Sequence, residues 1–264
     1  MTALRVAAGP DAQAAGDVGL VVASLPISLV AAETGTASDL VAVDGGPGWP
    51  QRATDVLRDG VRGLLIVHPV AVPPAAVPDA SFVPVVLDYR FAGNPVLPAM
   101  AKAFADWSAE AMIEVAAVVH DRSDLDRALV DQLATLRRVG QPAATLARLA
   151  WGSSGYYLSG RSSQGSPLLL SAHVTTGAPS SLRIRGLAAD VAVEATLPDP
   201  ATARPAVLVR TTPSGAITSP TLWETSHRTA WRRLHAVATG GRLTSDLSEL
   251  RTDLTVAGNV LTGR

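Results

Sequence analysis

Polar side chains that could take part in catalysis or binding follow the ends of apolar runs in the first third of the chain. His68 comes directly after LLIV, and Tyr89 and Arg90 come shortly after VPVVL. Continuous apolar runs of this length are typical of strands in a parallel sheet, which binds ligands at its carboxyl edge. Histidine titrates near neutral pH and arginine suits a carboxylate or a phosphate. We therefore predict a small polar metabolite at this edge, with His68 as the catalytic acid–base residue and Tyr89 and Arg90 as binding residues. A turn role for His68 and an ion-pair role for Arg90 are the alternatives.

The segment DGGPGW, which begins at Asp44 and ends at Trp49, follows another apolar run. Glycines at a strand end let the backbone approach a ligand closely, and an exposed tryptophan ring stacks on a sugar or a base. We expect Asp44 and Trp49 to join the binding site. The alternative is a tight turn in which Trp49 fills the seam between two lobes.

Several kinds of chemistry are excluded by what the sequence lacks. It has no cysteine, which rules out disulfides, thiolate nucleophiles and cysteine-bound metals. The remaining histidines are scattered: His227 and His235 lie eight residues apart, which is not a metal-ligand spacing within one helical turn. No phosphate-binding loop, serine hydrolase motif or zinc protease motif occurs. We therefore expect no metal site and no hydrolase activity.

Composition limits the partners and the location. The 264 residues carry 22 basic and 23 acidic side chains, for a net charge of -1, which gives no support for nucleic acid or an anionic membrane as partner. With 47% hydrophobic and 17% charged residues, the chain can build a sizeable core. Residues 18–32 are apolar but too short to span a bilayer, and Pro26 interrupts them. The N-terminus lacks the pattern of a signal peptide, so we expect a cytoplasmic protein.

The pattern changes from parallel α/β to antiparallel β along the chain. The first part predicts strands over 4–8, 20–23, 40–43, 64–67 and 83–87, with a helix between 50 and 63. The later part predicts strands over 110–119, 145–150, 155–159, 167–175, 181–196 and 204–211, and helices over 123–139, 226–238 and 245–261. The expected fold class is α/β plus α+β: a truncated Rossmann-like parallel sheet over 1–90, then a mostly antiparallel sheet with flanking helices over 91–264.

The order of these blocks resembles the Gfo/Idh/MocA family of nicotinamide-dependent oxidoreductases. The blocks that carry the resemblance are GLLIVHP (63–69), LDYRFAGNP (87–95) and the two C-terminal helices around GGR. In the family, a Glu-Lys-Pro triplet ends the strand that matches GLLIVHP, and its lysine contacts the substrate. The resemblance therefore implies a Rossmann-like lobe followed by an α+β lobe, an NAD(P) cofactor, and His68 at the lysine position.

Two departures from the family pattern bear on activity. The family places an Asp four residues before a catalytic His on one helix. Here LDRALVDQLATLRR matches that helix, with Asp126 at the Asp position and Val130 at the His position. A shift of one residue would put Asp131 there instead, and neither alignment offers an imidazole. Valine cannot transfer a proton. Gly9, Gly16 and Gly19 also lack the G-x-G-x-x-G spacing that brings a backbone close to a pyrophosphate.

These departures predict a divergent Gfo/Idh/MocA-like protein with a degenerate nucleotide-binding site. We expect a non-catalytic small-molecule-binding or partner subunit without a cofactor, in which Asp126 lines the site or caps a solvated helix face. The alternative is an NAD(P)-dependent oxidoreductase that acts on a sugar, a cyclitol or a similar polar metabolite. The weakly charged strands of the second sheet favour a homo-oligomer assembled through that sheet.

Overall fold

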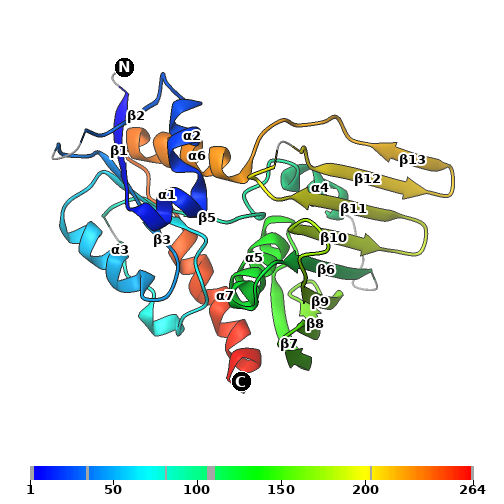
Figure 1. Cartoon of the computed structure of the whole chain (residues 1–264). Coiled ribbons are helices and arrows are strands. Elements are labelled where there is room, and N and C mark those ends of the chain that lie inside the picture. Colours follow the sequence, from blue (N-terminus) through cyan, green and yellow to red (C-terminus); the bar gives the residue numbers. More distant parts are fainter. Residues whose placement is uncertain (1–2, 34–35, 81, 106–110, 203, 263–264) are drawn as a thin grey trace. The chain divides into compact units, whose positions relative to one another are not determined.

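The computed structural model describes residues 3–33, 36–80, 82–105, 111–202 and 204–262. These residues form two compact units (Figure 1). The first unit contains Met1–Arg90 and Ser226–Thr252, and the second contains Phe91–Thr225 and Asp253–Arg264. The sequence had placed all of 226–264 in the second lobe, and this part of the prediction is wrong. The cause is that residues of this segment contact strand β5 (Val85–Asp88), although more than a hundred residues separate them from it along the chain.

The first unit is built on a parallel sheet with the strand order β2-β1-β3-β4-β5. Its elements are β1 (Leu4–Ala8), α1 (Pro10–Gly16), α2 (Val18–Ala23), β2 (Leu29–Ala31), β3 (Leu40–Asp44), α3 (Trp49–Arg58), β4 (Gly63–Val67), η1 (Pro74–Ala76), β5, α6 (Ser226–Gly240) and the start of α7 (Asp246–Leu261). The order of the strands reverses between β1 and β3, which is the point where ligands bind in open α/β sheets.

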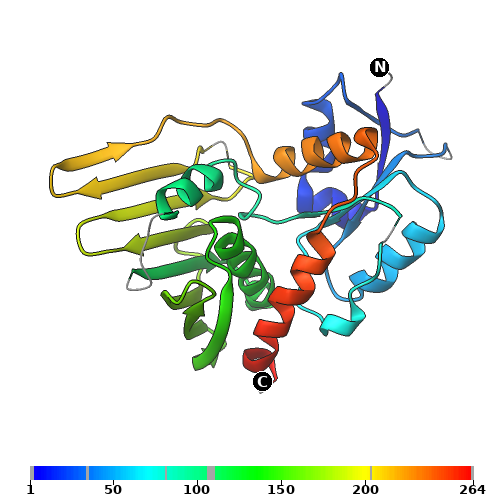
Figure 2. The same ribbon diagram turned by 180° about the vertical axis from the view of Figure 1, so that it is seen from behind.

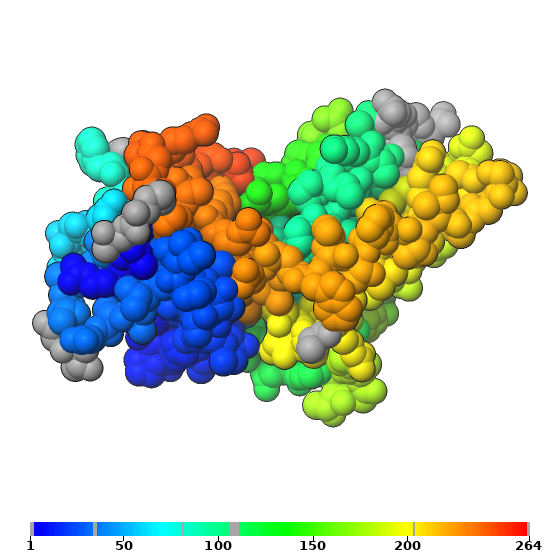
Figure 3. Space-filling view, turned by 90° about the horizontal axis from the view of Figure 1, so that it is seen from above, coloured from blue at the N-terminus to red at the C-terminus, as the bar shows by residue number. Residues whose placement is uncertain are grey.

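Helices α1, α2 and α6 share one face of this sheet. Alternate strand residues meet them in one apolar cluster, which includes Leu65 and Val67 of β4 and Trp231 and Leu234 of α6. Figure 3 shows the orange surface of α6 beside the blue surface of α2, and Figure 2 shows the length of α6. The other face of β4 is equally buried, since Ile66 is 0% exposed. A strand buried on both faces explains the continuous apolar run LLIV.

Residues 20–23 form part of helix α2, so the strand predicted there is wrong. The buried residues of this helix are Val18, Val21 and Val22, whose spacing of three and four is helical. A short apolar run does not distinguish a strand from a buried helical turn, and this one was assigned to the wrong class.

The second unit carries an eight-stranded sheet with the order β13-β12-β11-β10-β6-β9-β8-β7. Its elements are α4 (Leu97–Phe104), β6 (Met112–Val119), η2 (Arg122–Asp124), α5 (Leu125–Arg138), β7 (Ala143–Gly152), β8 (Gly155–Ser162), β9 (Pro167–Val174), β10 (Ser181–Leu187), β11 (Ala192–Pro198), β12 (Val207–Thr212), β13 (Gly215–Thr218) and the end of α7. All neighbours are antiparallel except β6 and β9. The predicted fold class is therefore confirmed.

Two details of the second sheet correct the sequence prediction. The single strand expected over 181–196 is a hairpin of two strands, because Ala188 N donates to Val191 O and closes a turn. The strand expected from residue 110 begins at Met112, and Glu110 itself lies outside the described residues. The two short strands β2 and β13 were not predicted.

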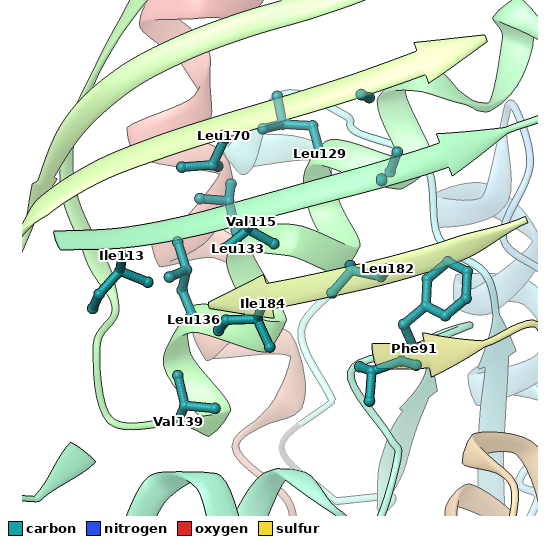
Figure 4. Packing of buried hydrophobic residues seen from close by; sticks show 14 of the residues in the cluster. Phe91, Ile113, Val115, Leu129, Leu133, Leu136, Val139, Leu170, Leu182 and Ile184 are labelled. Atoms are coloured by element: carbon teal, nitrogen blue, oxygen red, sulfur yellow. The ribbon is translucent and has the colours of Figure 1, made fainter. Parts of the chain in front are cut away.

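One face of this sheet packs on α5. Ile113 and Val115 of β6 alternate toward the helix, and Leu129, Leu133 and Leu136 meet them at a helical spacing (Figure 4). Beneath the sheet, Gln132 Nε2 donates to the carbonyl oxygens of Val115 and Ser171, so this buried amide is satisfied. In the part of the chain that the structure describes, no helix is both long and apolar enough to cross a membrane.

Strand β5 is an edge of the first sheet, and residues after α6 close that edge. The amide of Leu87 donates to Asp246 Oδ2 at 2.9 Å, and the hydroxyl of Thr244 donates to the carbonyl of Val85. Asp246 is 2% exposed and also accepts from Arg233 Nη1 at 2.8 Å. These contacts satisfy backbone groups that an open edge would leave unpaired.

Asp246→Asn should lower the free energy of unfolding of the first unit by about 3 kcal/mol, because a charge-assisted hydrogen bond is lost and Arg233 loses its counter-charge. Urea unfolding followed by circular dichroism measures this. The matched control is Asp55→Asn, since Asp55 pairs with Arg58 on an exposed helix face. Its effect should stay within about 0.5 kcal/mol. Equal effects of the two substitutions would contradict the role assigned to Asp246.

Candidate functional site

His68 directly follows strand β4 and has an unusual backbone conformation. Its φ angle is 50°, in the left-handed region that side chains other than glycine rarely adopt. Hydrogen bonds on both sides hold the turn: His68 N donates to Asp88 O at 2.8 Å, and Val70 N donates to Gly45 O at 2.8 Å. Neighbouring strand ends thus fix His68 at the carboxyl edge, where such strain often accompanies function.

The turn leaves no room for a side chain at Gly45. A Cβ atom there would lie 2.5 Å from Pro69 Cα, Pro69 N and Val67 O, all of them backbone atoms. The amide of Gly45 donates to Val67 O at 2.6 Å. Glycine at this position is therefore required by close approach of two backbone segments.

Asp88 and His227 form a buried pair beside His68. Asp88 follows Leu87 on β5 and is 0% exposed, and His227 lies in the first turn of α6 and is 3% exposed. Asp88 Oδ2 lies 2.8 Å from His227 Nδ1. The imidazole rings of His227 and His68 are 5.0 Å apart between centroids. A carboxylate and two imidazoles therefore meet where β4 and β5 end.

The end of helix α1 borders the group formed by His68, Asp88 and His227. A Cβ atom on Gly16 would lie 3.0 Å from Val67 Cγ1 and 3.6 Å from Asp88 Oδ2. Asp17 follows with a φ angle of 46° and separates α1 from α2. The end of α1 therefore packs directly on the strand ends that carry the two histidines.

The loop after β3 is closed by Arg52. Its guanidinium donates to the carbonyl oxygens of Asp44, Gly46 and Pro47, and it pairs with the Asp44 carboxylate at 3.3 Å. The Asp44 carboxylate also accepts from Gly46 N at 2.8 Å. The polar groups of this loop are used to hold its own shape.

Trp49 is 0% exposed, and its Nε1 donates to Val70 O at 3.1 Å. The stacking that we expected needs an exposed ring face, which this placement does not offer. Trp49 is part of the core of the first unit, and its hydrogen bond ties α3 to the residues that follow His68.

Tyr89 is 3% exposed, and Arg90 is half-buried with its carbonyl oxygen accepting from Ser226 Oγ at 2.6 Å. Ser226 immediately precedes His227, so this bond anchors the start of α6 next to the end of β5. The structure thus brings His68, Asp88 and His227 together and places Tyr89 and Arg90 directly after them in the chain.

Helix α5 of the second unit carries Asp126, half-buried in its first turn. Burial raises the pKa of Tyr156 well above its usual value, and the negative charges of Asp126 and Asp131 raise it further. Tyr156 therefore stays neutral and donates to Gln132 Oε1 at 2.7 Å.

Val130 is 1% exposed, and its neighbour Asp131 is engaged by backbone amides. The carboxylate of Asp131 accepts from Phe91 N at 2.9 Å and from Ala92 N at 2.7 Å. Both oxygens thus hold the start of the second unit. No proton-transferring side chain stands at the position that the family resemblance assigns to histidine.

The sequence did not point to Asp88 or His227 as site residues. The sequence analysis compared His227 only with His235, as a pair of metal ligands. Among the described residues, no three His, Cys, Asp or Glu side chains are grouped so that they could hold a metal ion. Asp88 lies one residue beyond the strand expected over 83–87 and was given no role. One sequence signal could have identified Asp88: it is an acidic residue next to a run of apolar residues, and a carboxylate buried in such a place requires a hydrogen-bond partner.

Comparison with known proteins supports the fold. No protein-family model matches the sequence, and no curated protein matches it. Among solved structures, an oxidoreductase from Sinorhizobium meliloti superposes with a TM-score of 0.74 at 11% identity, covering 98% of this chain and 96% of that one. A 3-ketoreductase mutant from Actinomadura kijaniata, in complex with NADP and TDP-benzene, gives 0.72 at 12% identity, covering 99% and 98%.

A UDP-N-acetylglucosamine 3-dehydrogenase from Acidithiobacillus ferrooxidans gives a TM-score of 0.68 at 13% identity, covering 98% of this chain and 97% of that one. The chain therefore shares the fold of Gfo/Idh/MocA-type oxidoreductases, and the resemblance seen in the sequence is confirmed at the level of the fold.

Gly45→Ala should destabilise the first unit by about 1–3 kcal/mol, because the added methyl group meets three backbone atoms that cannot move independently. Thermal unfolding measures the effect. Gly9→Ala is the matched control, since a Cβ atom at Gly9 has no neighbour within 4 Å. Its effect should be within about 0.5 kcal/mol. An unchanged melting temperature for Gly45→Ala would show that the turn at His68 is not clamped.

Proposed function

We propose that this protein is a non-catalytic relative of the oxidoreductases whose fold it shares, and that it binds a small polar metabolite at the carboxyl edge of the first sheet. The observation that carries the proposal is the start of α1, where this kind of fold receives a dinucleotide pyrophosphate. Helix α1 begins with Pro10, which has no N–H, and Asp11, which is exposed and negatively charged.

The residues present do not fit a pyrophosphate at α1. Gly9 precedes the helix without a side-chain cap, and the helix ends after seven residues at Gly16. A phosphate group there would meet the Asp11 carboxylate and would lack the amide that Pro10 cannot supply. The replacement of the family histidine by Val130 supports the same proposal. When a hydride leaves the carbon of an alcohol, a base must take the hydroxyl proton, and in the reverse direction an acid must supply it.

The second candidate is an NAD(P)-dependent oxidoreductase acting on a sugar, a cyclitol or a similar polar metabolite. The observation that favours it is the likeness, along nearly the whole chain, to a 3-ketoreductase in complex with NADP. In that case His68 would serve as the proton-transferring residue and Arg90 would hold an anionic part of the substrate. The cytoplasmic location expected from the sequence stays a prediction in either case.

Nicotinamide fluorescence distinguishes the two candidates. Titration with NADH and with NADPH should give weak binding or none, because α1 offers a carboxylate where the cofactor needs amides. The Actinomadura 3-ketoreductase, whose structure holds NADP, is the positive control. A dissociation constant in the low micromolar range, or cofactor that stays bound through purification, would contradict the proposal and support the oxidoreductase.

We further propose that the protein is a homo-oligomer assembled through the second sheet. The face of the sheet away from α5 carries Leu169 and Ala116 around a hollow of about 150 Å³, which Glu114 and Arg183 also line. Beside it, Arg185 lies between Glu114 and Glu194, at 3.9 Å and 3.8 Å. Apolar and small residues around a few paired charges are typical of a face that another subunit covers.

Light scattering at tens of micromolar protein should report a dimer or a larger assembly. Leu169→Glu should shift it toward monomer without loss of helical signal, since the substitution puts a charge into the proposed interface. Leu20→Glu is the matched control: Leu20 is 74% exposed and lies on α2 of the first unit. A wild-type monomer, or equal effects of both substitutions, would overturn the assembly.

A further inference from the structure

We propose that a second copy of this chain covers the open face of the second sheet in one particular orientation, with the two-fold axis of the dimer running across the strands. In this orientation Arg183 of each copy meets the carboxylates of Glu114 and Glu194 in the other copy. The inference rests on the proposed function, because it says how the copies of the proposed assembly meet. The open face is the face away from α5, and it carries these three residues and Arg185.

The burial pattern of the central strands defines the open face. Along β6, β10 and β11 every second residue is buried, and the residues between them are half-buried or exposed. Because successive side chains of a strand point to opposite faces, Arg183 and Arg185 lie on one face of β10 and the buried Ile184 on the other. Figure 1 shows β10 between β6 and β11, and these strands form the middle of the sheet.

The strand register arranges the charges of the open face in two rows that run across the strands. In the first row Arg185 of β10 lies between Glu114 of β6 and Glu194 of β11, which are its register partners. The guanidinium is 3.9 Å from the carboxylate of Glu114 and 3.8 Å from that of Glu194. Two carboxylates around one guanidinium leave this row with an excess of negative charge.

The second row contains an arginine without a counter-charge. Arg183 lies between Ala116 of β6 and Thr196 of β11. Among the residues that the structure describes, none forms an ion pair or a hydrogen bond with its side chain. It lines the hollow of about 150 Å³ together with Ala116 and Leu169. If another subunit covers this hollow, that subunit must supply a carboxylate, because a buried charge without a partner is unfavourable.

Two identical sheets with aligned strands can pack face to face around a two-fold axis in two ways, with the axis either along the strands or across them. An axis that runs along β10 places each charge row on the same row of the second copy. Arg183 then meets Arg183, and the negative row meets itself. Like charges that face each other across an interface are unfavourable, so the charge pattern disfavours this orientation.

An axis that runs across the strands at the level of Ile184 exchanges the two rows. Arg183 of one copy then lies over the negative row of the second copy, and the symmetry repeats this contact on the other side of the axis. Packed sheets are about 10 Å apart and their side chains interdigitate, which is within the reach of arginine and glutamate. Of the two orientations, this one makes the open face complementary to itself.

The same self-complementarity favours a second copy over a different protein as the partner. The open face supplies both the arginine and the carboxylates of the proposed contact. Around these charges, Ala116, Leu169 and Val209 are small or apolar and half-buried. A few matched charges among apolar residues are typical of the face between two subunits.

Arg183→Gln distinguishes the two orientations, with the dissociation constant of the dimer measured by sedimentation. In the proposed orientation the substitution should raise the dissociation constant about tenfold or more, since both symmetry-related contacts are lost. With the axis along the strands it should lower the dissociation constant, because it removes two like charges from contact. Raising NaCl from about 0.05 M to about 0.5 M should likewise weaken the proposed dimer, since salt screens attraction between opposite charges.

Arg210→Gln is the matched control. Arg210 is exposed on β12, and its register partner Val193 is buried, so its side chain lies on the face opposite to the open face. The control removes the same charge from the same sheet and should leave the dissociation constant unchanged. Circular dichroism of both variants checks that the fold is intact.

Charge reversal tests the pairing itself. Arg183→Glu and Glu194→Arg should each weaken the homodimer, because each places like charges at both contacts. A mixture of the two variants should form a heterodimer, in which every contact again joins opposite charges. Native mass spectrometry of the mixture, with a tag on one variant, measures this. A mixture that associates no better than either variant alone would overturn the pairing of Arg183 with Glu194.

The outcomes separate this inference from the proposed function. A wild-type dimer that Arg183→Gln tightens or leaves unchanged would overturn the orientation and leave the proposed assembly standing. A wild-type monomer would overturn the assembly and this inference with it. The proposed metabolite binding is independent of both results, because it concerns the first unit and is tested by titration with ligands.

Discussion

The first unit depends on the hydrogen bonds that Asp246 makes with the edge of β5. Its carboxylate accepts from the amide of Leu87 and is neutralised by Arg233, so a strand that would otherwise expose unpaired backbone groups is closed by residues from the end of the chain. The same return of the chain lays α6 on β4 and β5 and seats its first turn beside Asp88. The return of the chain therefore both closes the edge of the sheet and places His227 in the candidate site.

The second unit keeps the packing of its fold around a helix, α5, that has Val130 where the family resemblance implies a histidine. Leu129, Leu133 and Leu136 still fill the space beneath the sheet, which requires only apolar volume at helical spacing. Val130 is compatible with that packing but cannot transfer a proton. Both carboxylate oxygens of Asp131 accept hydrogen bonds from the amides of Phe91 and Ala92. Burial maintains this fold with an apolar residue at position 130, so the fold itself does not decide whether the chain is catalytic.

Much of the fold could be predicted from the sequence because its signals are local. Strand β4 is a continuous apolar run, and α5 shows the period of a helix, so both were found within a few residues. Helix α2 was missed because six apolar residues suit either class. The pairing of Asp88 with His227 joins residues 139 positions apart in the chain, which no local pattern encodes. Trp49 was assigned to the site because burial cannot be read from a glycine-rich turn.

The proposed function puts the ligand at the carboxyl edge of the first sheet and leaves the start of α1 without a dinucleotide. A map of amide chemical shifts, recorded with and without NADPH, tests this proposal most directly. We expect NADPH to leave the signals of Gly9, Asp11 and Ala12 in place, because Asp11 puts a carboxylate where the cofactor needs amides. Saturable shifts of these three signals on addition of NADPH would contradict the proposal.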